Sequence, residues 1–542
     1  MNKKVALPYL AEKSLNTKGT KYTKGKKRLD FTGFSFVAFV SFVFKRFLSV
    51  KNGRAKKVFH LALLLTVALA AGACRQVPEG GASSVPAELS SSSGEFLATP
   101  LPLPTRPNFK PGELVDYTAQ SGDTLPALAV RFNTSLAEIR TANPFIPEDA
   151  TTMPSGMPMK IPIYYLPLWG NPYQIIPDHA FVDSPTAIGF NSAAFVASQS
   201  GWLKNYRDYV GGEWRTGAGI VDYVSANFSV NPRLLLAILE YQSHALTDPK
   251  APDTPYALGY ADRSHDSIYL QLVWAANTLN NGYYRWRIGK LTSFDLPDGS
   301  QYRPDPWENA ASVGLQYYFS ISMSGNDFAS AVGPMGLARA YRDLFGDPWL
   351  DPFILIPGSL RQPELPLPFQ QGQAWTYTGG PHTGWGTGDP FAGIDFAPPS
   401  QTSGCFAADS ESYAIALGDG LIVRSETGLV VLDLDGDGNE RTGWVILYLH
   451  LATQGRAPLG LQVKQGDPVG WPSCEGGHAT GTHIHLARKY NGEWIPADGP
   501  IAFNLDGWAA RNGSEAYAGT LAKGGLIVTA STSSDANSRI RR

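Results

Sequence analysis

The sequence predicts a multidomain protein with three folded parts: a small βααβ domain, a mostly α-helical middle domain and a C-terminal all-β domain built on an antiparallel sheet. The chain has 542 residues, enough for about three or four domains. Stretches rich in Pro, Ser, Gln and Gly separate segments whose apolar residues follow different periods. A hydrophobic content of 43% with 17% charged residues excludes collagen-like and wholly disordered classes.

Charge is distributed unevenly along the chain, which argues against nucleic acid as a partner. The formal net charge is −2, but residues 1–60 hold 15 Lys and Arg residues and only two acidic ones. Residues 61–542 therefore carry 30 basic and 45 acidic side chains, a net charge of −15. Because binding to a phosphate backbone needs clustered Lys and Arg, we predict no nucleic-acid partner.

Residues 1–73 are predicted to be a signal-peptide region. A basic stretch at 51–57 precedes a short apolar run at 58–70 that ends in small residues, the layout of an export signal. Cys74 follows directly, and this arrangement resembles a bacterial lipobox, which implies lipidation of Cys74 and a membrane anchor. An ordinary signal peptide with an accidental Cys is the alternative. Since few signal peptides have such a long leader, translation is predicted to start near residues 48–50.

The rest of the chain divides by composition into folded parts and connecting segments. The predicted layout is a disordered linker at 75–112, a small domain at 113–165, a helical domain at 166–355, a linker at 356–372, a β domain at 373–525 and a disordered tail at 526–542. The β domain is predicted from short alternating runs rich in Gly and β-branched residues.

The small domain is predicted to fold as strand–helix–helix–strand. Thr124 is the predicted N-cap of its first helix, and Ser135 with Glu138 forms a capping box for a second helix that ends near Asn143. This layout, with Y-x-x-x-S-G-D-T-L near its start, resembles a LysM domain. The resemblance implies binding to glycans that contain N-acetylglucosamine, such as peptidoglycan or chitin. A small α/β spacer is the alternative.

The middle domain holds a helix that Asn231 is expected to cap, with Pro232 at the first helical position. The run NPRLLLAILEYQSHALT faintly resembles the catalytic helix of lysozyme-like transglycosylases, which carries Glu-Ser. Gln242 stands in place of that Glu, and Glu240 lies two residues away, roughly 200° around the helix. Because an amide cannot be the general acid of glycosidic cleavage, the domain is predicted to be a spacer or a degenerate, glycan-binding relic.

Histidines concentrated in the predicted β domain give the main chemical signal. Five of the nine histidines lie between residues 382 and 485. His483 and His485 are two residues apart in a strand-like run, so both imidazoles are expected on one face. Asp395 lies among apolar residues, where an unpaired carboxylate is costly to bury, and His382 follows a Gly-rich loop. Zinc hydrolases need three protein ligands and an open position. No H-E-x-x-H occurs, which excludes a zincin.

Together with T-G-T-H-I-H at 480–485 and Y-L-H-L at 448–451, His382 and Asp395 resemble the motifs of the lysostaphin-type zinc metallopeptidases, in particular the beta-lytic/staphylolysin branch. The resemblance covers about residues 375–500. It implies a cleft in which peptide bonds of peptidoglycan are hydrolysed with Zn²⁺ as cofactor.

The resemblance also implies a role for each matching residue. His382, Asp395 and His485 would ligate Zn²⁺, His483 would be the general base, and His450 would help to stabilise the transition state. In the common motif a His stands four residues before the Asp, where this chain has Phe391. His382 must therefore reach the metal from further upstream.

The two cysteines after Cys74, Cys405 and Cys474, both lie in the β domain. In an exported protein a disulfide between them is the default expectation. The alternative, that Cys474 is a fourth zinc ligand, would close the site and prevent catalysis.

A short acidic run, DLDGDGNE at 433–440, imitates the start of a Ca²⁺-binding loop. Asp433, Asp435 and Asp437 stand at alternating positions, but Trp444 replaces the Glu that an EF-hand needs at position 12. Ca²⁺ at these aspartates is one interpretation. A hairpin turn is the other, since D-G is a good turn signal.

The sequence therefore predicts a lipid-anchored, extracytoplasmic zinc endopeptidase that cleaves peptide crosslinks of peptidoglycan while the LysM domain holds the glycan. The first alternative is a catalytically inactive wall-binding regulator of other murein hydrolases. The second is a glycosidase that depends on Glu240.

Overall fold

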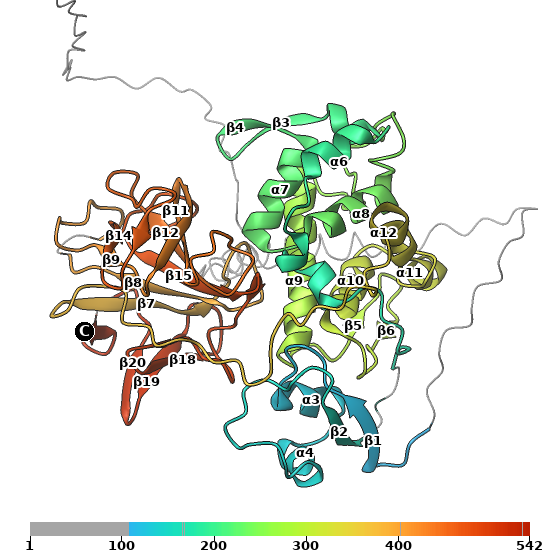
Figure 1. Ribbon diagram of the computed structural model, residues 1–542, viewed down its shortest axis with the longest axis horizontal. Coiled ribbons are helices and arrows are strands. Elements are labelled where there is room, and N and C mark those ends of the chain that lie inside the picture. The colour runs from blue at the N-terminus through green and yellow to red at the C-terminus, as the bar shows by residue number, and fades with distance from the viewer. Residues whose placement is uncertain (1–107, 165, 167–168, 401–402, 534) are drawn as a thin grey trace, which may run out of the picture. The chain divides into compact units, whose positions relative to one another are not determined.

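The computed structural model describes residues 108–164, 166, 169–400, 403–533 and 535–542, all within one compact unit of the chain, Ala98–Arg542 (Figure 1). The predicted signal region, Cys74 and most of the predicted first linker lie outside the described residues. Over the described ranges, no helix is both long enough and apolar enough to cross a bilayer.

The first folded part is the predicted strand–helix–helix–strand unit. Its elements are β1 (Glu113–Thr118), α3 (Leu125–Arg131), α4 (Leu136–Ala142) and β2 (Pro158–Ile163), and the two strands pair antiparallel. Thr124 accepts the N–H of Ala127 as the N-cap of α3, and Ser135 forms the expected capping box with Glu138. Local side-chain chemistry therefore sets both helix starts, as predicted.

The middle part is mostly helical, as predicted. Its helices are α5 (Asp178–Phe181), α6 (Ser192–Ser198), α7 (Gly217–Phe228), α8 (Pro232–Ser243), α9 (Ile268–Arg287), α10 (Ala310–Ser320), α11 (Gly325–Ala331) and α12 (Leu337–Phe345), with two short hairpins, β3 (Arg207–Val210) with β4 (Glu213–Thr216) and β5 (Phe294–Asp295) with β6 (Gln301–Tyr302). The long helix α9 packs against α7 and α10. Helix α8 begins with Asn231 as its N-cap and Pro232 at the first position, as expected.

The C-terminal part is rich in antiparallel strands. In the described part of the chain, nine strands form one sheet in the order β13-β10-β11-β12-β15-β8-β7-β21, with β16 paired to β15. Their bounds are β7 (Ala374–His382), β8 (Gly393–Ala397), β10 (Gly420–Glu426), β11 (Gly428–Asp433), β12 (Trp444–Leu451), β13 (Gln462–Val463), β15 (Ile484–Tyr490), β16 (Glu493–Trp494) and β21 (Arg539–Arg541). One smaller sheet pairs β9 (Ala414–Ile415) with β14 (Pro468–Gly470). Another is formed, in this order, by β17 (Asn504–Leu505), β18 (Trp508–Asn512), β19 (Gly519–Lys523) and β20 (Leu526–Thr529).

Both faces of the large sheet are buried, in two different cores. Val430, Ile446 and Tyr448 belong to the core of the C-terminal part, whereas their sequence neighbours Val431 and Leu447 join the core of the helical part. Successive residues of a strand point to opposite faces, so one sheet contributes to both cores. Continuous apolar runs such as GWVILYLHL reflect this burial on two sides.

The end of the chain differs from the disordered tail predicted at 526–542. Residues 526–529 form β20, and β21 pairs with β7, with Ile540 only 2% exposed. The prediction was wrong because a three-residue strand with one apolar side chain is too short to be recognised by alternation. The predicted linker at 356–372 has no helix or strand, yet its apolar Leu367 and Phe369 are buried in the sheet's core.

A buried guanidinium joins segments that are far apart in sequence. Arg287, at the end of α9, forms ion pairs with Asp178 (3.1 Å) and Glu493 (2.9 Å), and it donates to the hydroxyl of Tyr283 and the backbone carbonyl of Ser121. Its side chain is 6% exposed. A buried charge is tolerated only where it is paired and hydrogen-bonded, so this residue links the small domain, the helices and β16.

Replacing Arg287 by Met should destabilise the fold strongly, because two buried carboxylates would lose their cation. We expect the free energy of unfolding to fall by about 3–5 kcal/mol, measured by chemical denaturation followed by tryptophan fluorescence. Arg339→Met is the matched control, because the ion pair of Arg339 with Asp343 is exposed and should contribute less than about 1 kcal/mol. Equal losses in the two variants would contradict the linking role.

Candidate metal centre

The metal ligands predicted from the sequence meet on three adjacent strands. His382 ends β7, Asp395 lies on β8, and His485 lies on β15. His485 is directly opposite Asp395 in the antiparallel register, and His382 is opposite Gly393. Residues that face one another across strands point to the same side of a sheet, so the three side chains converge.

Three atoms form the point of convergence. His382 Nε2 lies 2.9 Å from His485 Nδ1, and Asp395 Oδ1 lies 3.3 Å and 3.1 Å from these two nitrogens. All three residues are buried, at most 5% exposed. The edge of a tetrahedron around Zn²⁺ with bonds of about 2.0–2.1 Å is roughly 3.3 Å, close to these separations.

The far nitrogen of each imidazole fixes its protonation. His382 Nδ1 faces the carbonyl of Gly380 at 2.8 Å, and His485 Nε2 faces the carbonyl of Gly384 at 3.1 Å. A carbonyl only accepts, so in the neutral rings these nitrogens carry the hydrogens and the facing nitrogens present lone pairs. Two lone pairs and a carboxylate oxygen directed at one point fit a cation, so the residues present suit a metal ion.

The surroundings keep Asp395 ionised and His485 neutral, whereas the Asp395 carboxylate favours protonation of His382, and metal binding would compete with that proton. Burial would raise the pKa of Asp395, but the charge of His382 and the hydrogen bonds from His382 and His485 lower the pKa well below its usual range. Burial lowers the pKa of His485. Burial also opposes charge on His382, but the neighbouring Asp395 carboxylate raises the pKa of His382 overall. A carboxylate and a neutral imidazole are the forms that bind metal.

The predicted disulfide is present, between Cys405 and Cys474. Cys474 is therefore no metal ligand, and the alternative of a closed site with Cys474 as fourth ligand is wrong. Among the described residues, no fourth His, Cys, Asp or Glu joins the group of His382, Asp395 and His485. Three protein ligands with one open position are typical of a catalytic metal site.

His483 and His450 lie beside this group. His483 Nε2 is 3.9 Å from Asp395 Oδ2, and the rings of His450 and His483 are 4.5 Å apart between centroids. His483 Nδ1 donates to the carbonyl of Gly481 (2.7 Å) and His450 Nδ1 to that of Glu475 (2.9 Å), so each Nε2 is left as the acceptor in the neutral ring. Burial, with the nearby histidines, lowers the pKa of His450 to about 4.

Sequence reasoning missed the residue that holds His382 in place. The ring of Tyr517 stacks on the His382 imidazole with centroids 4.0 Å apart. The backbone carbonyl of Tyr517 accepts a hydrogen bond from the N–H of Gly380, and the backbone N–H of Tyr517 donates to the carbonyl of Pro381. Tyr517 belongs to no motif and meets His382 only through tertiary pairing, so the sequence carries no signal for it.

Two glycines give a signal that the sequence does contain. A Cβ on Gly393 would collide with the ring of His485, and a Cβ on Gly379 would collide with the carboxylate of Asp395. Both glycines pair across strands with a residue of the centre. A glycine directly opposite a predicted ligand therefore marks space that the metal centre needs.

Helix α9 holds the loop between β7 and β8. The Oδ1 atoms of Asn277 and Asn281 accept the backbone N–H of Thr387 (2.7 Å) and Asp389 (2.8 Å). Arg285 pairs with the Asp389 carboxylate at 2.8 Å. The same loop contains the Gly384 carbonyl that orients His485, so α9 supports a ligand of the centre from outside the sheet.

The acidic run at 433–440 lies in the turn between β11 and β12. Asp433 accepts the backbone N–H of Asp435 and Gly438, and Asp437 accepts that of Asn439. Although the three aspartates lie close together, their carboxylates stabilise a hairpin turn, and no observation supports Ca²⁺.

Glu240 stabilises the loop that follows α8. Its carboxylate accepts the N–H of Leu246 (2.8 Å) and the hydroxyl of Thr247 (2.5 Å). With both oxygens used in this way, Glu240 has a local structural role, which weighs against the glycosidase alternative.

Comparisons with known proteins match the small domain and the helical middle domain to known families. Residues 117–162 match the LysM domain family and residues 174–359 match the family described as LasA, N-terminal domain. Protease LasA from two strains of Pseudomonas aeruginosa is 24% identical over 349 residues, which cover 59% of this chain and 75% of that protein. The predicted LysM domain is confirmed, and the chain is similar to a known protease.

Solved structures with partial likeness include peptidases. The M23 metalloprotease pseudoalterin is 22% identical and covers 31% of this chain and 96% of that one, with a TM-score of 0.26. The catalytic domain of lysostaphin from Staphylococcus simulans is 21% identical over 23% of this chain and 87% of that one, with a TM-score of 0.16. Because both TM-scores are far below 0.5, neither likeness carries weight for fold or function.

Removing one ligand should abolish metal binding. We expect the purified protein to retain one zinc ion per chain after dialysis, and Asp395→Asn and His485→Ala to retain less than about a tenth of it, because two ligands no longer hold the ion. Metal content by mass spectrometry checks this. His478→Ala, at an exposed loop position, should match the unaltered protein. Full zinc content in either ligand variant would refute this centre.

Loosening the α9 contact should weaken the centre without removing a ligand. We expect the double variant Asn277→Ala/Asn281→Ala to bind zinc roughly 10–100-fold more weakly, because the loop that orients His485 loses two hydrogen bonds. Competition with a chromogenic chelator measures the affinity. Asn191→Ala removes the cap of α6 instead and should leave zinc affinity unchanged.

Proposed function

We propose that this protein is a zinc metalloendopeptidase of the cell envelope that hydrolyses peptide crosslinks of peptidoglycan. The observation that carries the proposal is the convergence of His382 Nε2, Asp395 Oδ1 and His485 Nδ1 on one buried point with two further histidines beside it. A mixed set of two imidazoles and one carboxylate suits Zn²⁺. The similarity to Protease LasA supports peptide hydrolysis.

The residues around the centre have distinct proposed roles. When bound, zinc supplies Lewis acidity towards the scissile carbonyl. His483 takes the proton from the attacking water at Nε2, which its Nδ1 contact with Gly481 leaves free. His450 is held with a free Nε2 as well, so it can stabilise the developing negative charge only as the imidazolium, with a proton taken from solvent. Its lowered pKa of about 4 makes that form scarce at neutral pH.

The LysM domain is proposed to hold the glycan while the C-terminal part cuts the peptide. Peptidoglycan carries glycan and stem peptide in one polymer. Binding of the glycan therefore raises the effective concentration of the attached peptide at the C-terminal part. We further propose that the protein acts outside the cytoplasm and that lipidation of Cys74 anchors it to a membrane.

The alternative, a wall-binding regulator without activity, is less well supported. Such a protein needs no complete ligand set, whereas here the three proposed ligands lie together, with both additional histidines beside them. Zinc content and catalysis distinguish the two.

The decisive experiment measures which bond of peptidoglycan is broken. We expect the purified protein to release new amino groups and no new reducing ends, and expect release to stop with a zinc chelator and in His485→Ala. Glu240→Gln is the matched control in the helical part and should retain full activity.

Other outcomes would redirect the assignment. New reducing ends that vanish in Glu240→Gln would move the activity to the helical domain. Sedimentation with the wall and no bond cleavage would favour the regulator.

A further inference from the structure

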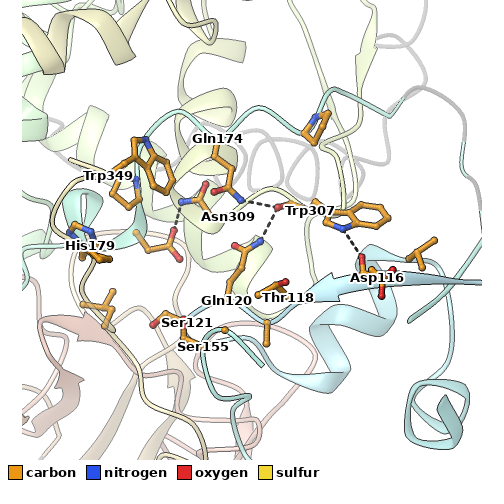
Figure 2. A pocket seen from close by; sticks show the side chains of 18 of the residues that line it. Asp116, Thr118, Gln120, Ser121, Ser155, Gln174, His179, Trp307, Asn309 and Trp349 are labelled. Carbon is orange, nitrogen blue, oxygen red and sulfur yellow. Dashed lines mark hydrogen bonds between the residues drawn. The ribbon is translucent and has the colours of Figure 1, made fainter. Parts of the chain in front are cut away.

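A groove of about 1000 Å³ lies between β1 of the LysM domain and the helical domain (Figure 2). The LysM side contributes residues such as Asp116, Gln120 and Ser121, and the helical side contributes Gln174 and Trp349. The volume is at the upper end of the range for ligand pockets, about 300–1,000 Å³, so a chain of several sugar-sized units has room.

Two glutamines from opposite sides of the groove are fixed by one carbonyl. Gln120 Nε2 and Gln174 Nε2 both donate to the backbone oxygen of Trp307, at 2.8 Å and 2.9 Å. The Trp307 indole in turn donates to the carbonyl of Asp116. Because each amide nitrogen is held, each amide oxygen has a fixed direction, and among the described residues neither oxygen accepts a hydrogen bond. The groove therefore contains two oriented acceptors.

Aromatic and polar side chains extend this arrangement. Figure 2 shows Trp349 and His179 towards one end, Trp307 and Asp116 towards the other, and the glutamines between them. Trp349 lines the groove and is 42% exposed, so its side chain is accessible to a ligand. His179 Nδ1 is buried and has no hydrogen-bond partner in the part of the chain that the structure describes.

The charges of the lining exclude one class of wall polymer. Glu113, Asp116 and Asp178 line the groove, and no Lys or Arg does so among the described residues. Asp178 is paired with Arg287 and Asp116 with Lys160, so the lining offers a phosphate-rich polymer no unpaired cation. A neutral chain with hydroxyl and amide N–H donors fits the oriented acceptors, and its C–H faces fit the electron-rich face of an indole.

We propose that this groove binds a neutral oligosaccharide of N-acetylated sugars, so that the LysM and helical domains share one glycan site. This inference rests on the proposed function, because it places the glycan of the same substrate. Trp349 stacks on a sugar ring, and the amide oxygens of Gln120 and Gln174 accept from hydroxyl or acetamido groups. The helical domain is then part of the substrate-binding surface.

The test measures binding of the N-acetylglucosamine tetramer to the full protein by calorimetry. We expect Trp349→Ala to weaken binding roughly tenfold and Gln174→Ala roughly fivefold, as stacking or one hydrogen bond is lost. Trp349→Phe retains a ring and should recover most of the affinity. Trp214→Ala is the matched control, because Trp214 is 72% exposed on the β3–β4 hairpin outside the groove, and it should bind as the unaltered protein does.

Three results would overturn the shared site: no binding of the tetramer, unchanged affinity in both groove variants, or displacement of the tetramer by a free stem peptide. Release of amino groups from a short crosslinked peptide without sugar is measured on the same preparations. Loss of that cleavage with intact, Trp349-dependent sugar binding would contradict the peptidase assignment and uphold the groove. Intact cleavage together with sugar binding that does not depend on Trp349 would uphold the peptidase assignment and contradict the groove.

Discussion

The structure of the C-terminal part depends on one electrostatic constraint: two imidazole lone pairs and a carboxylate oxygen are directed at a single buried point. With both imidazoles neutral and no cation present they repel one another, so their positions must be imposed by the surrounding chain. The carbonyls of Gly380 and Gly384 impose the tautomers, and Tyr517 holds the ring of His382. Antiparallel pairing of β8 with β15 places Asp395 directly against His485. These contacts would preorganise the proposed metal site before any metal arrives.

The helical domain takes part in this preorganisation through one face of α9. Asn277, Asn281 and Arg285 follow one another at four-residue spacing, so they lie in a row on the helix and reach successive groups of the β7–β8 loop. The same helix ends in Arg287, the cation between Asp178 and Glu493. A helix whose face aligns the loop beside His382 and His485 is more than a spacer, in contrast to one of the interpretations that the sequence left open.

What the sequence could predict is what local chemistry determines. Neighbouring residues determine the helix caps at Thr124 and Ser135 and the face that alternate residues of a short strand share. Motif spacing predicted the three ligands, although Phe391 departs from the common pattern. Tyr517 and the strand around Ile540 could not be predicted, because each is defined by a partner more than a hundred residues away. Non-local pairing of this kind leaves no periodic signal in a single sequence.

The contacts of the LysM domain change how glycan binding would act on cleavage. Ser121 exchanges hydrogen bonds with the backbone of Ile356, and Thr152 bonds to the backbone of Pro357 and Ser359. Arg287 donates to the backbone carbonyl of Ser121. A freely tethered module would raise the local concentration of substrate at any spacing its linker permits. A module fastened by such bonds would instead fix the span between bound sugar and cleaved peptide. If the proposed function holds, the spacing of stem peptides along the glycan would then help to determine which crosslinks are cut.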